Sequence, residues 1–215
     1  MVFGLDKCAM LEMQAGVKVA SRAIELPDGK AIEEVDAEGY KYLGVLEGAG
    51  IMEREMKDIV GKEYARRVKK VAESKLYAGK MVGAVNSWAV SVVRYTAGIL
   101  EWTDKELQQM NVKTRKRLTM NRAFHKVSNV DRLYMKRKEG GRGLLSVEEC
   151  VRSEELALCE YVRASEEPML AEVAANTVEG EPKVDFKRRR ADERKNGLME
   201  KKLHAKEVVS DRSWQ

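Results

Sequence analysis

Residues 81–100 read MVGAVNSWAVSVVRYTAGIL and form the most apolar stretch of the chain. Their apolar side chains recur at steps of three and four, so that they cover most of the circumference of a helix. Asn86 and Arg94 interrupt the stretch, which favours a buried helix over a membrane span. We therefore expect residues 81–100 to form the central helix of a bundle.

Helical patterns on both sides extend this bundle from residue 50 to residue 166. Gly79 and Gly83 indicate a loose junction just before the central helix. One apolar face is expected on the preceding helix, at Met56, Ile59, Val60, Tyr64, Val68 and Val71. Lysines and arginines occupy much of the rest of that helix.

Two capping boxes predict where the later helices begin. Thr103 with Glu106 marks the first start, and Ser146 with Glu149 marks the second. Residues 123–134 read as a loop with a short turn, and Gly140–Gly143 as a flexible break. The inner side chains are expected to be Leu107, Met110 and Leu118 in the first helix, and Val147, Cys150, Val151, Leu158 and Val162 in the second.

The region before residue 50 reads instead as short strands and turns. β-like runs cover 17–19, 23–26 and 40–45, and Pro27-Asp28-Gly29 is typical of a turn. The expected fold class is α+β and mainly helical, with a short β-hairpin before the bundle. The expected divisions are residues 1–48, 50–166 and 167–215. The last comprises a linker, which Pro168 introduces, and a basic helical tail.

Charge is distributed unevenly along the 215 residues, whose net charge is +5. Residues 112–142 carry eleven lysines and arginines against two acids, whereas residues 25–55 are acidic. Such asymmetry indicates a polyanionic partner for one face, or else a well-solvated helical surface. The eleven bases are Lys113, Arg115, Lys116, Arg117, Arg122, Lys126, Arg132, Lys136, Arg137, Lys138 and Arg142.

Residue types that carry metal or nucleophilic chemistry are scattered. No two aspartates are adjacent, although two-metal phosphoryl transfer needs clustered carboxylates. Cys150 and Cys159 would face opposite sides of a helix, and His125 and His204 have no partner at ligand spacing. We expect neither a metal nor another cofactor. Three cysteines and no visible signal peptide favour an intracellular protein, nuclear or cytoplasmic.

Four stretches in order resemble the region after the catalytic motif of non-LTR retrotransposon reverse transcriptases. Phe3–Cys8 resembles the end of a palm motif, and Tyr40–Val45 resembles the primer grip. Asn86–Val90 and Val93–Gly98 resemble the thumb helix, and Asp131–Tyr134 with Arg137–Leu144 resembles the segment after the thumb. The resemblance covers roughly residues 3–165. It implies that the catalytic Asp-Asp turn, the fingers and most of the palm are missing. The chain would then have no polymerase activity, and Lys7 would have no leaving group to protonate.

The resemblance implies a thumb-like domain that binds RNA or an RNA–DNA duplex through its backbone, without a membrane partner. The alternatives are a helical protein-interaction module and a relic without function. In the isolated chain, however, Tyr42 and Leu43 are expected to be core contacts. The candidate nucleic-acid-binding residues are Tyr42, Leu43, Gly44, Lys62, Arg66, Lys69, Lys113, Arg115, Lys116, Arg117, Arg122, Arg137, Lys138 and Arg142.

Overall fold

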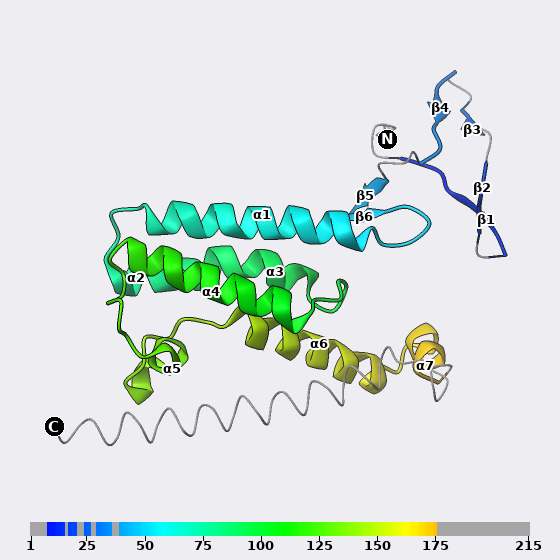
Figure 1. Ribbon diagram of the computed structural model, residues 1–215. Helices are drawn as coiled ribbons and strands as arrows, with labels where there is room; N and C mark the ends of the chain where they lie inside the picture. The colour runs from blue at the N-terminus through cyan, green and yellow to red at the C-terminus, as the bar shows by residue number, and fades with distance from the viewer. Residues whose placement is uncertain (1–7, 16, 21–23, 27–28, 36–38, 176–215) are drawn as a thin grey trace. The chain divides into compact units, whose positions relative to one another are not determined.

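The computed structural model describes residues 8–15, 17–20, 24–26, 29–35 and 39–175 (Figure 1). The chain divides into two compact units, residues 1–59 and 60–215. The division falls inside helix α1 (Glu53–Ala72), whereas the expected boundary lies at residues 48–50. Helices predominate and short antiparallel hairpins precede them, as the sequence predicted.

Among the described residues of the first unit, the strands form three two-stranded antiparallel hairpins. β1 (Glu12–Gln14) pairs with β2 (Val17–Val19), and β3 (Ile24–Glu25) pairs with β4 (Ala31–Ile32). β5 (Tyr40–Tyr42) pairs with β6 (Val45–Glu47). The expected single run at residues 40–45 is therefore the inner part of a hairpin. The residues predicted to form the turn at Pro27 and Asp28 lie outside the described residues.

The turn between β5 and β6 has only two residues, Leu43 and Gly44. Their φ angles are +45° and +87°, the left-handed values that a tight hairpin turn requires at both positions. Tyr42 and Leu43 are 54% and 71% exposed, so the expectation that they are core contacts is wrong for the described part of the chain. A two-residue turn projects its side chains away from the ladder, which explains the exposure.

The expected central helix is interrupted and shorter than predicted. Helix α2 (Ala78–Ala84) leads through a π-helical turn, η2 (Val85–Ala89), into α3 (Val90–Thr96). Gly79 and Gly83 lie inside α2 and are not a junction. The chain turns at Gly98, whose φ is +83° and where a Cβ would lie 2.8 Å from Leu158 Cδ2. Leu100 is fully buried beyond the end of the helix.

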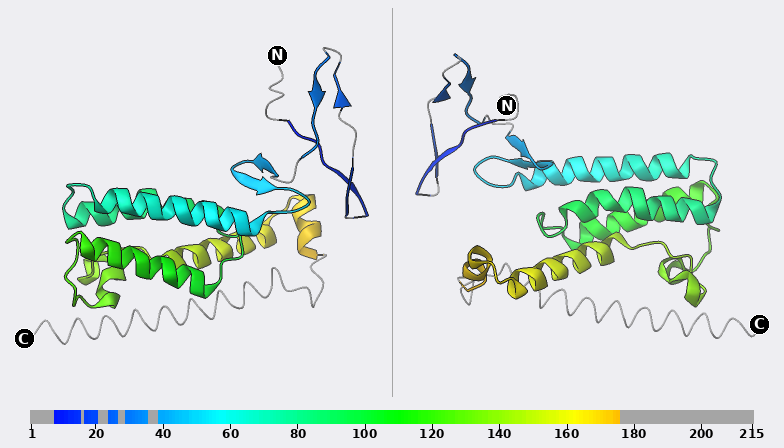
Figure 2. Two further views of the ribbon diagram at one scale, coloured as in Figure 1. Left: turned by 45° about the horizontal axis from the view of Figure 1, so that its top comes forward. Right: turned by 180° about the vertical axis from the view of Figure 1, so that it is seen from behind.

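Four long helical segments lie side by side in the second unit (Figures 1 and 2). Gly61 faces Met110 and the Tyr64 hydroxyl lies 2.7 Å from Thr114 Oγ1, so α1 runs parallel to α4 (Asp104–Met120). Asn111 donates to Ser146 Oγ at 3.0 Å, at the start of α6 (Val147–Ala164). Because the other end of α4 contacts Arg152, α6 runs antiparallel to α4.

Most of the buried apolar side chains in the second unit are aliphatic. In α1 the expected inner face is confirmed at Val60, Tyr64, Val68 and Val71, and Met56 is buried too, but Ile59 is 51% exposed. Each residue advances about 100° round a helix, which places Ile59 outside the stripe. The side chains with almost no exposure include Val82, Val85, Val90, Val93, Leu100, Leu107, Leu118, Leu144, Val147 and Val151.

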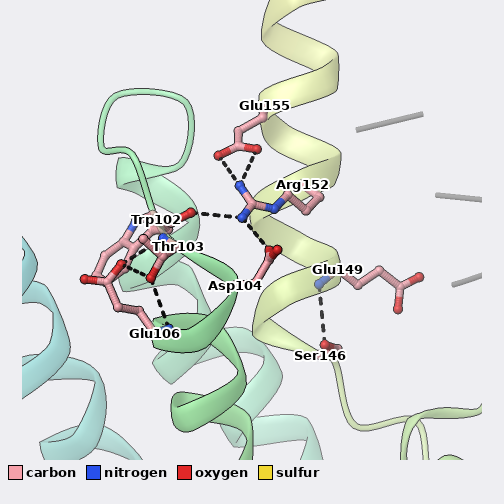
Figure 3. A network of polar contacts seen from close by, with 8 residues as sticks. All are labelled: Trp102, Thr103, Asp104, Glu106, Ser146, Glu149, Arg152 and Glu155. Carbon is pink, nitrogen blue, oxygen red and sulfur yellow. Dashed lines mark hydrogen bonds and ion pairs between the residues drawn. The ribbon is translucent and has the colours of Figure 1, made fainter. Parts of the chain in front are cut away.

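Helix α6 departs most from its expected inner stripe. Val147 and Val151 are buried as predicted, but Leu158 is 43% exposed and two charged residues, Arg152 and Glu155, are buried instead. Arg152 donates to Glu155 at 2.7 and 2.8 Å, to Asp104 at 2.9 Å and to the Trp102 carbonyl at 2.9 Å (Figure 3). The buried pair therefore ties α6 to the start of α4.

Burial alone would lower the pKa of Arg152, but its hydrogen bonds with Glu155 and Asp104 raise it overall. The guanidinium therefore stays charged. Its Nε has no hydrogen-bond partner within the described residues, so even this network leaves one buried donor unsatisfied.

Both predicted helix starts are confirmed, the first by a complete capping box and the second by the Ser146 half of the predicted box. Thr103 Oγ1 accepts from Glu106 N, and the Glu106 carboxylate accepts from Thr103 N at 2.7 Å, which completes a capping box (Figure 3). Ser146 Oγ accepts from Glu149 N at 3.4 Å. Pro168 begins a helix, α7 (Pro168–Ala175), where a linker was expected. Proline is tolerated at the first helical position because the N–H it lacks has no partner there.

The segment from residue 129 to residue 145 is ordered by hydrogen bonds and is not a flexible break. Asn129 caps α5 (Val130–Tyr134), and η3 (Arg137–Glu139) follows. Gly143 N donates to the Met135 carbonyl at 2.8 Å, and Leu144 N to the Leu133 carbonyl at 2.9 Å. The Asn86 side chain donates to the Gly143 carbonyl and accepts from Leu145 N. Asn86 thus fixes this segment to the π-helical turn.

Candidate nucleic-acid interface

The second half of α4 carries bases and no acids. Its acids, Asp104 and Glu106, lie in the first turn, where they complement the helix dipole. Lys113, Lys116 and Arg117 are exposed and lie three and four residues apart, so they share one face of the helix. No hydrogen bond or ion pair to another described residue engages these three side chains. They form a solvated row of positive charge.

Helix α1 carries further bases beside its line of contact with α4. Met110 lies against Gly61, and Arg117 is two turns beyond Met110 on the same flank of α4. On α1, Lys62 and Lys69 are exposed on the outer side next to this line of contact. Lys69 Nζ lies 3.9 Å from Glu73, a weak exposed pair. Two parallel helices thus contribute bases to one surface, which we call the α1–α4 face: Lys62, Lys69, Lys113, Lys116 and Arg117.

Arg115 does not belong to this surface. It donates to the Tyr134 hydroxyl at 2.7 Å, and its guanidinium carbon lies 5.7 Å from the centre of that ring. Burial raises the pKa of Tyr134, and the hydrogen bond from Arg115 opposes that rise. Arg115 therefore connects α4 to α5. The contact with Tyr134 sets Arg115 apart from the exposed bases Lys113, Lys116 and Arg117.

Arg137 is also engaged by the backbone. Its Nη2 donates to the Gly79 carbonyl at 2.7 Å, and its Nε donates to the Arg142 carbonyl at 3.4 Å. The side chain therefore links η3 to the start of α2. Arg122, Lys138 and Arg142 are exposed, and within residues 39–175 their side chains make no hydrogen bond or ion pair. Arg122 has a φ of +62° at the end of α4.

Arg66 is held by a carboxylate on its own helix. Glu63 accepts from Arg66 at 2.6 Å twice and from Arg67 at 2.7 Å. Hydrogen bonds from Arg66 and then Arg67 lower the pKa of Glu63 from its ordinary 4.5 to about 2. Both guanidinium groups lie over the Trp88 ring, 5.9 and 5.2 Å from its centre. The spacing of Glu63, Arg66 and Arg67 signals the ion pairs, but not the contact with Trp88.

The hairpin tip, Tyr42, Leu43 and Gly44, belongs to the first unit and is exposed but uncharged. The expected palm residue Lys7 and the basic tail lie outside the described residues. In the described ranges, no three histidine, cysteine or acidic side chains gather as metal ligands would. None of the described helices combines the length and the apolar character that a membrane crossing requires.

Comparison with known proteins gave no match, whether against family models, curated protein sequences or solved structures.

Proposed function

We propose that this chain is a piece of a non-LTR retrotransposon reverse transcriptase that binds nucleic acid through the sugar–phosphate backbone and does not polymerise. The single observation that carries the proposal is the α1–α4 face. Its bases are exposed, and on the second half of α4 they stand without a neighbouring acid on their own helix. The ordered sequence resemblance supplies the reverse-transcriptase part of the proposal.

Bases of this kind neutralise phosphates and release condensed counterions, so binding is independent of sequence and weakens as salt rises. Lys113, Lys116 and Arg117 need not break an existing contact with a described residue in order to bind. Arg66, Arg115 and Arg137 would have to give up hydrogen bonds with Glu63, Tyr134 and Gly79. The first three residues therefore carry most of the proposed contact.

The test compares two variants of equal charge. Replacing Lys113, Lys116 and Arg117 by Gln removes the row on α4, and replacing the exposed Arg54, Lys75 and Lys80 by Gln removes three bases elsewhere. The measurement is fluorescence anisotropy with an RNA–DNA duplex across a salt series. Three to five phosphate contacts predict a slope of log affinity against log salt of about −2 to −4 for the unmutated chain.

We expect the α4 variant to flatten this slope by about 2 and the control to leave it nearly unchanged. Unrelated duplex sequences should lose affinity equally, because backbone contacts carry no base information. Absence of binding by the unmutated chain at low salt would exclude the proposal. Primer extension on an RNA template with Mg²⁺ should give no product above a control without protein.

A helical protein-interaction module is the second candidate, and exposed apolar side chains near the end of α6 favour it. Leu158 and Tyr161 are 43% and 63% exposed, and Leu158 lies against Gly98, beside the 36% exposed Ile99. Exposed apolar groups that cluster mark interaction sites more often than isolated ones do. Changing Leu158 and Tyr161 to Ser should leave the salt slope unaltered if nucleic-acid binding is the function.

A further inference from the structure

Trp88 stands on the surface with two arginines against it. It lies in the π-helical turn η2, and 40% of the residue is exposed. The guanidinium carbons of Arg66 and Arg67 lie 5.9 and 5.2 Å from the ring centre, a distance at which a cation interacts with an aromatic face. Arg67 Nη1 also donates to the Trp88 carbonyl at 2.8 Å. The tryptophan and its arginines are thus fixed together.

Glu63 occupies these guanidinium groups much as a phosphate would. Its two oxygens accept three short hydrogen bonds, two from Arg66 and one from Arg67. Planar guanidinium groups bind carboxylates and phosphates through the same paired donors. The Glu63 side chain is 31% exposed, so solvent reaches this position.

We propose that Arg66, Arg67 and Trp88 form a binding site for one nucleotide of a single-stranded nucleic acid. A base stacks on the exposed part of the indole, and the adjoining phosphate takes the place of the Glu63 carboxylate on the two guanidinium groups. Stacking on aromatic side chains accepts any base, and basic neighbours track the backbone. The proposal rests on the proposed function and adds a second site, on the side of α1 that faces η2.

Glu63 then acts as an internal competitor for the phosphate. The phosphate must displace the carboxylate of Glu63, which lies on the same helix as both arginines. This competition weakens nucleotide binding. Duplex nucleic acid keeps its bases stacked inside the helix, so the site should prefer single strands or unpaired ends. By contrast, the α1–α4 face contacts phosphates only and should bind duplexes as well.

The experiment compares two Glu→Gln variants that change net charge equally. Glu63→Gln frees the two arginines, whereas Glu160→Gln removes an exposed carboxylate from α6. With a labelled oligouridylate of about twelve nucleotides as the probe, Glu63→Gln should tighten binding about threefold to tenfold, and Glu160→Gln less than about twofold. The RNA–DNA duplex should respond nearly equally to both.

Trp88 tests the stacking part of the site. In the Glu63→Gln background, Trp88→Leu should weaken oligouridylate binding about fivefold or more, and Trp88→Phe should restore part of that loss. Far-UV circular dichroism shows whether each variant remains folded. If Glu63→Gln and Glu160→Gln bind oligouridylate equally, and Trp88→Leu has no effect, the nucleotide site is wrong while the α1–α4 face stands. If no variant binds any nucleic acid at low salt, both proposals fall.

Discussion

The two units of the chain bury their apolar side chains to very different extents. In the described part of the first unit, the buried apolar side chains are Val35 in a loop after β4, Val45 in β6 and Met56 in the first turn of α1. The described part of the second unit buries whole helical faces against one another, and ten of its larger aliphatic side chains are almost fully buried. Stability should therefore be concentrated in the second unit.

The physical reason lies in the periodicity of the sequence. A helix of seventeen to twenty residues presents one continuous apolar stripe, so each helix pair removes a large area from water. An isolated two-stranded hairpin is at best marginally stable, because it buries little and must still order its backbone. Substitutions at Val85, Arg152 and Leu43 test this difference between the two units.

The largest effect should come from Val85→Asp in the π-helical turn. Val85 is 0% exposed, so the new carboxyl must either ionise without a partner or remain protonated at neutral pH. A shift of three to four pKa units plus the lost apolar burial corresponds to roughly 5 kcal/mol or more. The matched substitution Val17→Asp, at a residue 65% exposed in β2, should change stability by less than about 0.5 kcal/mol.

Chemical denaturation followed by circular dichroism at 222 nm measures both variants. If Val85→Asp and the unmutated chain have equal denaturation midpoints, η2 does not belong to the core. A large loss for Val17→Asp would show that the first unit contributes more stability than its burial indicates.

Arg152→Met should have the next largest effect. It leaves Glu155, only 5% exposed, without its guanidinium partner, and breaking a buried pair in this way costs about 3 to 4 kcal/mol. The double variant Arg152→Met with Glu155→Leu removes both charges and should recover most of that loss. Thermal denaturation of the single and double variants gives the coupling. If the double variant is no more stable than the single one, the ion pair itself is the stabilising element.

The smallest effect should be a gain, in the first unit. Leu43 has a φ of +45°, which is strained for a branched apolar residue, and Gly44 follows it. Leu43→Asn creates the Asn-Gly pair that tight hairpins favour and should stabilise β5–β6 by about 1 kcal/mol. Amide hydrogen exchange at residues 40–47 should slow, while exchange in α3 and α4 stays unchanged. Faster exchange at Tyr42 would contradict a strained turn.

Local signals made much of the bundle predictable. The capping box at Thr103 and Glu106 and the stripe through Tyr64 and Val68 involve residues three or four apart, so the sequence alone expresses them. The π-helical turn η2 carries Asn86, whose side chain hydrogen-bonds to Gly143 and Leu145, 57 and 59 residues away. The turn that follows the helix end at Thr96 brings Gly98 against Leu158. No local pattern contains that contact.

In the candidate site, too, local features were predictable from the sequence and contacts between distant residues were not. Lys113, Lys116 and Arg117 were predictable as exposed bases, because their face opposes the stripe through Leu107 and Leu118. Arg115 and Arg137 are instead held by hydrogen bonds to Tyr134 and to the Gly79 carbonyl. These partners lie 19 and 58 residues away along the chain, so no local pattern predicts them. The same holds for Arg152, whose burial requires Asp104 and the Trp102 carbonyl across 48 and 50 residues.

Gly141 offers a genetic means of separating a working protein from a decaying copy. A Cβ at this position would collide with the backbone carbonyl of Met135, which cannot move aside as a flexible side chain could. Nearly every first- or second-base change in a glycine codon introduces a side chain, so random drift would erase this residue early. In a population sample of the gene, purifying selection should leave codon 141 with third-base variation alone. Missense changes there at the neutral rate would indicate that no selected function depends on the folded bundle.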